Sequence, residues 1–261
     1  MAKLNNPSST TLPLLQRFYP EARFGGFSDV DGTITFYTRV QAMLSPDSVV
    51  LDVGCGRGAG LQDDSVVYRR ELRRLRGRCQ RVIGIDVDPA AADNPGLDEF
   101  HLLDLAGDGW PVATASIDLI VSDFVLEHIE EPKAYFAEVA RVLKPGGIYC
   151  ARTSNCIGYV GLAARLVPNR RHAQVLQRVQ RDRAEIDIFP TRYRANTVWA
   201  LRRELQTAGL DGIVYGYEAE PSYLGFATWT YAIGKLIHAL TPAPLRTCLF
   251  VFAYNSNVEH S

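Results

Sequence analysis

The sequence predicts an α/β domain in which a sheet of buried strands carries helices on both faces. Two observations predict it. Short apolar runs alternate with segments of helical periodicity from about residue 33 to residue 147, as in folds built from strand–helix–strand units. One further helix and two closing apolar runs follow. Ligands of such sheets bind at the carboxyl ends of the strands, where this sequence places glycines and acids.

The predicted strands are continuously apolar runs rich in β-branched residues, as expected of strands buried on both faces. SVVLDVG, residues 48–54, is the clearest of them, and FHLLD, residues 100–104, is the weakest. Seven runs fit the description, at 48–54, 81–88, 100–104, 118–123, 148–154, 213–217 and 248–254.

The predicted helices repeat apolar side chains three and four residues apart. The helix predicted over 64–76 is expected to turn Val67 and Leu72 inward. Lys-Pro-Gly-Gly at 144–147 should break another helix, and Asn196 is a good N-cap for the last one. Helices are predicted at 33–44, 64–76, 132–143 and 196–209.

The bulk composition is that of an ordinary globular protein. Its 261 residues are 47% hydrophobic and 22% charged, enough for one elaborated domain with a sizeable core. The formal net charge of −1 gives no general attraction to nucleic acid, so no DNA-binding role is expected. Five scattered cysteines without a C-x-x-C pair argue against a disulfide framework or a zinc site and favour the cytoplasm.

No segment predicts a membrane span. The first 13 residues lack the apolar core of a signal peptide. The apolar segment YLGFATWTYAIG, residues 223–234, is about half of the roughly 20 residues that a span needs, and Lys235 interrupts it. We expect a cytoplasmic protein, for which peripheral membrane contact stays open and the oligomeric state is not predicted.

The stretch VVLDVGCGRGAG, residues 49–60, joins the first strand to a glycine-rich turn. The spacing from Gly54 onward fits G-x-G-x-x-G/A, so NAD and S-adenosylmethionine are both candidate ligands. Asp52 favours the second, because a carboxylate beside a diphosphate costs on the order of 1 kcal/mol or more, whereas it stabilises an ammonium and a sulfonium. Asp86, which ends the second strand, can accept hydrogen bonds from ribose hydroxyls of either ligand.

Five motifs occur in a fixed order: LDVGCGRG (51–58), GIDVD (84–88), HLLDL (101–105), IDLIVSDFVLEHIEEP (117–132) and LKPGG (143–147). Together they resemble the class I S-adenosylmethionine-dependent methyltransferases, in particular the methyltransferase type 11 group. The resemblance implies a Rossmann-like, mostly parallel sheet of seven strands whose last strand is antiparallel. It also implies S-adenosylmethionine as the cofactor and S-adenosylhomocysteine as its product.

The resemblance further implies which residues contact the cofactor. They are Asp52, Gly54, Gly56 and Ser122 around the methionine part, Asp86 at the ribose, and Val87, Asp104 and Leu105 at the adenine. Ser122 would contribute its backbone carbonyl to the ammonium. Asp104 has an alternative role as a cap of the strand end.

Methyl transfer requires alignment of the acceptor, and a hydroxyl acceptor also needs a base. His128, just past the fourth predicted strand, is the candidate general base, and ordering of the loop is its alternative role. Glu127-His128 is similar to a metal-binding variant of small-RNA and ubiquinone-pathway methyltransferases. Phe124 stands where that variant has a second Glu, so no metal site is predicted.

Acceptor-binding residues are expected outside the shared sheet. The candidates are Tyr37 and Arg39 near the N-terminus, and Tyr159 and Tyr193 in the segment 156–195. The predicted division is a lead-in at 1–32, a methyltransferase domain at 33–155 and 196–256, a lid or acceptor-binding insertion at 156–195, and a second insertion at 221–246. The aromatic residues of the second insertion suit an apolar acceptor or a lipid surface, or they form ordinary core.

The function predicted from these observations is O-methylation of a small molecule or of a glycan or lipid intermediate. A catalytically silent scaffold with the same fold and an NAD-dependent oxidoreductase are alternatives. An RNA methyltransferase is a third, because arginines cluster at 69–81 and 165–194. The first cluster is either an anion-binding patch or, as is commoner, a solvated helix face.

Overall fold

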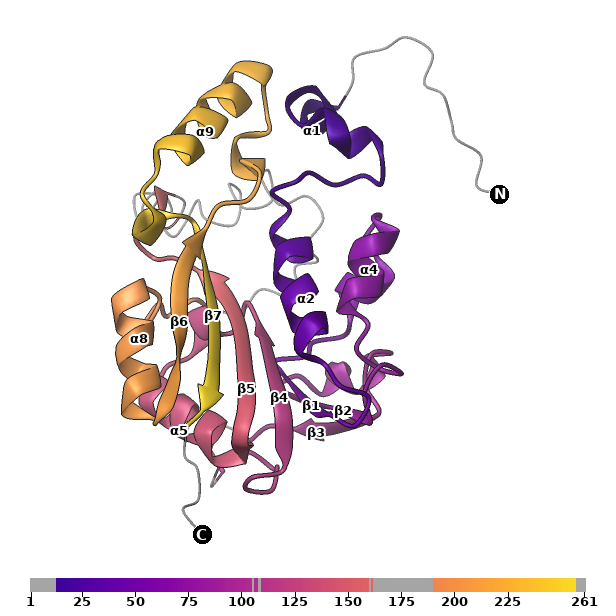
Figure 1. Ribbon diagram of the computed structural model, residues 1–261, viewed down its shortest axis with the longest axis vertical. Coiled ribbons are helices and arrows are strands. Elements are labelled where there is room, and N and C mark those ends of the chain that lie inside the picture. Colours follow the sequence, from indigo (N-terminus) through magenta and orange to yellow (C-terminus); the bar gives the residue numbers. More distant parts are fainter. Residues whose placement is uncertain (1–12, 105, 108, 160, 162–189, 257–261) are drawn as a thin grey trace.

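The computed structural model describes residues 13–104, 106–107, 109–159, 161 and 190–256. Its centre is a seven-stranded sheet of order β3-β2-β1-β4-β5-β7-β6 (Figure 1). Strand β7 pairs antiparallel with both β5 and β6, and the other pairs are parallel. The predicted fold class is therefore confirmed. The strands are β1 (Val49–Val53), β2 (Arg81–Asp86), β3 (Glu99–Leu102), β4 (Ile117–Asp123), β5 (Leu143–Ser154), β6 (Leu210–Tyr217) and β7 (Cys248–Asn255).

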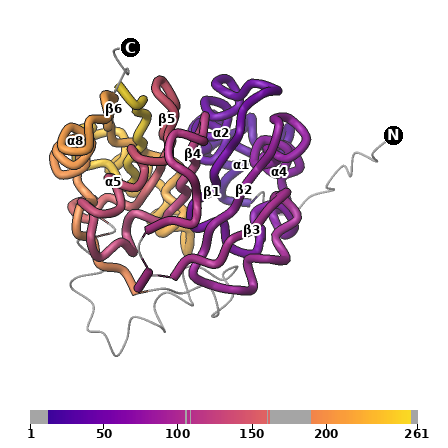
Figure 2. The backbone as a smooth tube through the Cα atoms, turned by 90° about the horizontal axis from the view of Figure 1, so that it is seen from below, coloured from indigo at the N-terminus to yellow at the C-terminus, as the bar shows by residue number. Residues whose placement is uncertain are grey.

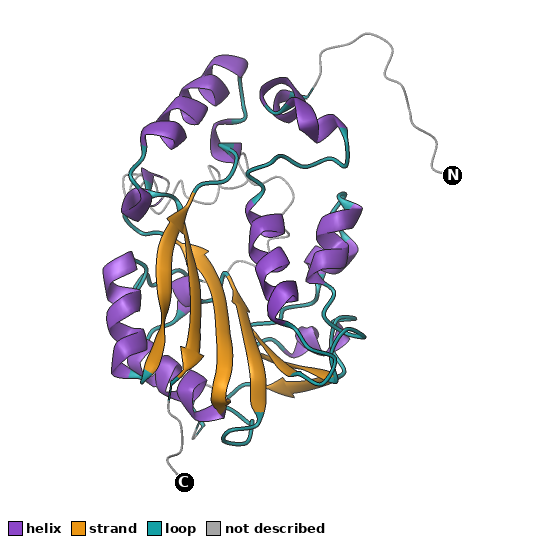
Figure 3. Cartoon of the chain, in the orientation of Figure 1, coloured by secondary structure: helices purple, strands orange, loops and turns teal. Residues whose placement is uncertain are grey.

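Helices cover both faces of the sheet, as Figures 2 and 3 show. On one face, α2 (Gly32–Met43) packs Phe36 against a core that includes Val50 of β1. On the other, α5 (Pro132–Val142) and α8 (Val198–Thr207) pack Phe136 and Leu201 against a core that includes Leu51. Neighbouring residues of β1 thus enter opposite cores, because successive side chains of a strand alternate between its faces.

The remaining helices and helical turns complete the described chain. They are α1 (Leu14–Phe18), η1 (Pro20–Arg23), α3 (Ala59–Gln62), α4 (Val67–Arg73), η2 (Pro89–Asp93), η3 (Leu126–His128), η5 (Ser222–Leu224), α9 (Thr228–Leu240) and η6 (Ala243–Leu245). Helices α1 and α9 lie beyond the carboxyl ends of β4 and β5, apart from the sheet (Figure 1). A small apolar cluster of Tyr19, Ala22 and Tyr231 joins them.

The helix predicted over 64–76 is shorter than expected and differently oriented. It begins at Val67, which is 59% exposed instead of facing inward, and Val66 is buried in its place. The cause is Asp64, whose carboxylate accepts a hydrogen bond from the amide of Val66 and fixes a turn there. Leu72 is buried as predicted.

Two predicted element ends are also wrong. Helix α5 ends at Val142, just before Lys-Pro-Gly-Gly as predicted, but the next strand begins at Leu143, which pairs with Ile117 of β4, and not at residue 148. The N-cap of α8 is Thr197, whose hydroxyl accepts a hydrogen bond from the amide of Ala200. Asn196 is buried, and its amide donates to Thr153 and Ser154 instead.

Candidate functional site

The loop after β1 turns through three glycines in the left-handed region. Gly54, Gly56 and Gly58 have φ angles of 66°, 51° and 74°, which other residues rarely adopt. A Cβ on Gly54 would lie 2.5 Å from Val125, and one on Gly58 would lie 2.5 Å from Asn94. At Gly56 a Cβ would meet nothing within 4 Å. The backbone of Gly56 therefore faces open space, where a ligand can approach it closely.

Two side chains hold this loop in place. Asp86, at the end of β2, accepts a hydrogen bond from the amide of Gly56 at 2.8 Å. Asn94 donates to the carbonyls of Cys55 and Gly56 at 2.8 and 3.0 Å, and accepts from the amide of Gly96 at 2.8 Å. Sequence reasoning missed Asn94, because nothing in ADNPG distinguishes it from an ordinary turn residue.

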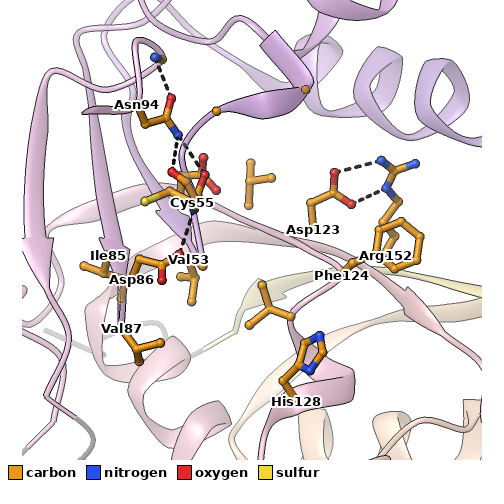
Figure 4. A pocket seen from close by; sticks show the side chains of 18 of the residues that line it. Val53, Cys55, Ile85, Asp86, Val87, Asn94, Asp123, Phe124, His128 and Arg152 are labelled. Carbon is orange, nitrogen blue, oxygen red and sulfur yellow. Dashed lines mark hydrogen bonds and ion pairs between the residues drawn. The ribbon is translucent and has the colours of Figure 1, made fainter. Parts of the chain in front are cut away.

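The loop forms one wall of a cavity of about 1510 Å³ at the carboxyl ends of β1, β2 and β4 (Figure 4). Ligand cavities typically measure roughly 300–1,000 Å³, so this one has room for a cofactor and an acceptor together. Many of the predicted site residues line it, namely Tyr37, Asp52, Gly54, Gly56, Asp86, Val87, Asp104 and His128.

The residues predicted at the adenosine end lie along one side of the cavity. Asp86 is buried, and its two carboxylate oxygens accept from the amides of Gly56 and Asp88. Each oxygen keeps a second acceptor site for a ribose hydroxyl. Val87 is 39% exposed and can cover an apolar ring. Asp104 is exposed and accepts from the amide of Ala106, the capping contact that was its alternative role.

Asp52 is the most perturbed acid of the cavity. Burial, followed by the charges of Asp123 and Asp86, raises its pKa from 3.8 to about 8. Asp52 therefore lies under the charges of Asp86 on its own wall and of Asp123 on the opposite wall, and it is protonated at neutral pH. A cationic ligand would relieve this repulsion, and a diphosphate would add to it.

A buried ion pair forms the opposite wall, as Figure 4 shows. Arg152 of β5 donates from Nε and Nη2 to the two carboxylate oxygens of Asp123, and Tyr37 donates to the same carboxylate at 3.1 Å. Burial acts to raise the pKa of Asp123, but the guanidinium outweighs it and holds that pKa below its ordinary value. The guanidinium also lies 4.9 Å from the ring of Phe124.

Phe124 has a strained backbone. Its φ of 58° lies in the left-handed region, which costs a bulky residue about 1–3 kcal/mol. Its amide donates to the carbonyl of Arg152 at 2.9 Å, and both residues line the cavity. Sequence reasoning missed Asp123 and Arg152 as site residues, although Asp123 ends a predicted strand as Asp52 and Asp86 do.

Glu127 and His128 point in different directions. Glu127 is buried and accepts hydrogen bonds from the hydroxyls of Thr153 at 2.7 Å and Ser154 at 3.2 Å. His128 lines the cavity, with Nδ1 3.1 Å from the carbonyl oxygen of Pro190. The two side chains therefore do not form a common ligand pair. Among the described residues, no group of three His, Cys, Asp or Glu could hold a metal ion.

Several predicted site residues are not brought to the cavity. Ser122 is fully buried and its hydroxyl accepts from Tyr135. Arg39 is exposed and lies near Tyr215 of β6, whose pKa its charge acts to lower. Tyr159 and Tyr193 do not line the cavity either. The hydroxyl of Tyr159 instead hydrogen-bonds the ring of His238. Leu105 lies outside the described residues.

The arginines of 69–81 are paired with acids, except Arg70, which donates to the backbone carbonyl of Asp64. Arg69 and Arg73 both bind Asp64, and Arg69 also binds Asp31. Burial acts to raise the pKa of Asp64, but these arginines lower it to about 2. The other pairs are Arg74 and Arg78 with Glu71, Arg76 with Asp98, and Arg81 with Glu99. The cluster is therefore a network of ion pairs, and most of the second cluster, 165–194, lies outside the described residues.

A Rossmann-like sheet with a glycine turn, an acid after each of two strands and an adjoining cavity defines a class of adenosine-binding domain. Residues 51–151 match the family model of the methyltransferase domain. The matched region holds the glycine turn together with Asp52, Asp86 and Asp123, and it is similar to the class I S-adenosylmethionine-dependent methyltransferases.

Two curated relatives illustrate the similarity. A protein of Mycolicibacterium smegmatis described as "probable S-adenosylmethionine-dependent methyltransferase" is 34% identical over 117 residues, which are 42% of this chain and 39% of the relative. The malonyl-(acyl-carrier protein) O-methyltransferase of Hahella chejuensis is 39% identical over 110 residues, 38% of this chain and 33% of the relative. The chain thus spans well under half the length of these relatives.

Solved structures share the fold. A chain from the complex between the Haloferax volcanii Trm112 methyltransferase activator and the putative methyltransferase has a TM-score of 0.53 and 18% identity, over 88% of this chain and 92% of that one. The (4+2)-cyclase SpnF has a TM-score of 0.51 and 20% identity, over 85% and 80%. Within the described residues, no helix is both long and apolar enough to cross a membrane.

Proposed function

We propose that this chain is a methyltransferase that methylates an oxygen atom of a small molecule or of a glycan or lipid intermediate. The observation that carries the proposal is the raised pKa of Asp52, caused by burial and by the charges of Asp123 and Asp86, in a cavity that the open backbone of Gly56 also lines. S-adenosylmethionine has the two cationic groups that such a site favours and lacks the diphosphate that it disfavours. The family match supports the same cofactor.

When bound, S-adenosylmethionine supplies an electrophilic methyl group. The residues of this chain bind and orient it. Gly54 and Gly56 would contact its methionine and ribose part, with Asp52 at the methionine end. Asp86 would accept the ribose hydroxyls, and Val87 would cover the adenine. The rest of the cavity has to hold the acceptor in line with the methyl group and exclude water.

His128 is the proposed general base. The carbonyl of Pro190 can only accept a hydrogen bond, so Nδ1 of His128 carries the proton in that contact. In the neutral ring Nε2 is then the proton acceptor, as removal of a hydroxyl proton requires. Pro190 lines the same cavity, so this contact orients the ring at the site.

Calorimetric titration with S-adenosylmethionine, S-adenosylhomocysteine and NAD tests the cofactor. We expect the first two to bind and Asp86→Ala to weaken them by about 1–3 kcal/mol. The control Asp211→Ala, whose carboxylate binds Tyr254 on β7, should leave binding unchanged. Binding of NAD without S-adenosylmethionine would exclude the proposal.

Turnover of a candidate acceptor tests the base. His128→Ala should lower kcat by about 10²–10⁴-fold with little change in KM. His101→Ala is the matched control, because His101 lies on β3 and does not line the cavity. An unchanged kcat in His128→Ala would leave His128 only the alternative of ordering its loop.

A catalytically silent scaffold is the second candidate, since the fold alone does not require methyl transfer. Cofactor binding without turnover of any hydroxyl acceptor would favour it.

The division proposed for the chain remains a methyltransferase domain at 33–155 and 196–256 with insertions at 156–195 and 221–246.

A further inference from the structure

Helix α9 carries an apolar face that the rest of the described chain leaves uncovered. Trp229, Ile233, Leu236 and Leu240 are 67%, 48%, 60% and 73% exposed. Their spacing places them on one side of the helix, and Phe226, 72% exposed, precedes them. We call these five residues the α9 face. A contiguous apolar surface of this kind marks an interaction site, whereas single exposed apolar residues do not.

Contacts on the opposite side of α9 hold this face outward. Gly234 lies so close to η5 and the residue before it that a Cβ there would be 2.7 Å from Pro221. The Thr230 hydroxyl donates to a carbonyl of η5 at 2.7 Å, and the ring of Tyr231 stacks on Phe18 of α1 at 4.9 Å. Rolling the helix to bury the α9 face would break all three contacts.

The segment that carries the α9 face has basic residues and no acidic ones. The chain has no Asp or Glu from 221 to 247. Lys235 of α9 donates to a carbonyl of α1, and Arg17 of α1 donates to the first residue of α9, so both cations lie at the junction of the two helices. The two preceding acids, Glu218 and Glu220, accept hydrogen bonds from hydroxyls of the protein itself.

We propose that the α9 face docks on an anionic lipid bilayer. Its aromatic and aliphatic side chains would enter the boundary between headgroups and acyl chains, and Lys235 and Arg17 would meet the negative headgroups. A second copy of the chain suits this surface less well. A symmetric contact pairs each face with itself, which would bring the same cations together without an acid from 221–247 between them.

Docking in this way also orients the cavity. Helices α1 and α9 lie at the carboxyl end of the sheet (Figure 1), where the cavity lies. Ala219 and Glu220, just before η5, are part of its wall. An acceptor anchored in the bilayer would therefore reach the cavity from the docked side. This last step rests on the proposed function, whereas the docking itself does not.

Vesicle flotation of the full chain tests the docking. We expect the protein to float with phosphatidylcholine vesicles that contain phosphatidylglycerol, more weakly with phosphatidylcholine alone, and less at high salt. Leu236→Ser and Leu240→Ser should each lower the partition coefficient roughly tenfold. The control Trp199→Ser removes a side chain that is 58% exposed on α8, away from α9, and should change nothing.

Three results would overturn the docking proposal. One is a wild-type protein that floats with neither vesicle, and another is a double variant, folded by circular dichroism, that floats like the wild type. The third is a dimer in light scattering that Leu236→Ser and Leu240→Ser dissociate, since it would assign the α9 face to a second copy. Failure of the methyltransferase proposal is distinguishable from these results. In that case the protein would not bind S-adenosylmethionine but would still float with the vesicles.

Discussion

Cofactor binding should release a proton from Asp52. Its pKa of about 8 in the ligand-free protein results from burial and from the charges of Asp123 and Asp86, so the group is mostly neutral at pH 7. A ligand with a positive charge beside Asp52 binds the ionised form better than the neutral one. Binding therefore pulls the proton off, and affinity should rise with pH until the carboxyl is ionised without the ligand.

The size of the effect follows from the ionised fraction. With a pKa of about 8, the carboxyl is ionised to about 0.3% at pH 5.5 and about 9% at pH 7. A ligand that requires the ionised form should therefore bind about thirtyfold more tightly at pH 7 than at pH 5.5. The ligand's own α-amino group, with a pKa of roughly 8, stays mostly protonated over this range.

Calorimetry of S-adenosylmethionine binding measures both quantities. Titrations at pH 6.5 in buffers of different ionisation enthalpy should show about one proton released per site. Asp52→Asn, which is neutral at every pH, should abolish the proton release and flatten the pH dependence. The reasoning is refuted if the wild type binds equally at both pH values, or if the variant keeps the wild-type slope.

Further substitutions test the parts of the site separately. Without ligand, Asp52→Asn should stabilise the protein by a few kcal/mol at about pH 8 and hardly at all at about pH 4. Folding raises the pKa of Asp52, so the wild-type protein loses stability as the pH rises through that window. Urea unfolding at both pH values measures the difference. Asp123→Asn leaves the buried Arg152 without its counter-charge and should cost about 3–5 kcal/mol, whereas Asp118→Asn, which breaks a half-exposed pair with Lys144, should cost under about 1 kcal/mol. Asn94→Ala removes two hydrogen bonds to the glycine loop and one from the amide of Gly96, and it should cost about 1–3 kcal/mol and weaken cofactor binding. Unchanged stability and affinity would show that the loop keeps its conformation without Asn94.

The fold was predictable because its signal is local. The first four strand runs end at glycine or an acid, and SVVLDVG at 48–54 contains the whole of β1. Element ends depend on partners that a local pattern does not show. Asn196 has the side chain of an N-cap, but Thr153 and Ser154 lie within its reach, so Thr197 caps α8 instead.

The site was predictable where an acid lies at the carboxyl end of a strand. That rule found Asp52 and Asp86, and applied to DLIVSD it would also have found Asp123. The choice of Arg39 beside Tyr37 could have been avoided, because residues two apart on a helix do not share a face. Arg152 could not have been found, since its pairing with Asp123 depends on the register between β4 and β5.

The acids on the two walls of the cavity differ in whether a cation of the protein pairs with them, and this difference suits a cationic ligand. On one wall Arg152 neutralises Asp123, so that carboxylate stays ionised whatever binds. On the other, the part of the chain that the structure describes contributes no salt bridge to Asp52, and its raised pKa reflects burial beside two acids. The carboxyl of Asp52 can thus pair with a cationic ligand, but it lowers the stability of the ligand-free protein. A neutral or anionic ligand would gain nothing from that arrangement, so the same carboxyl that destabilises the empty site selects what fills it.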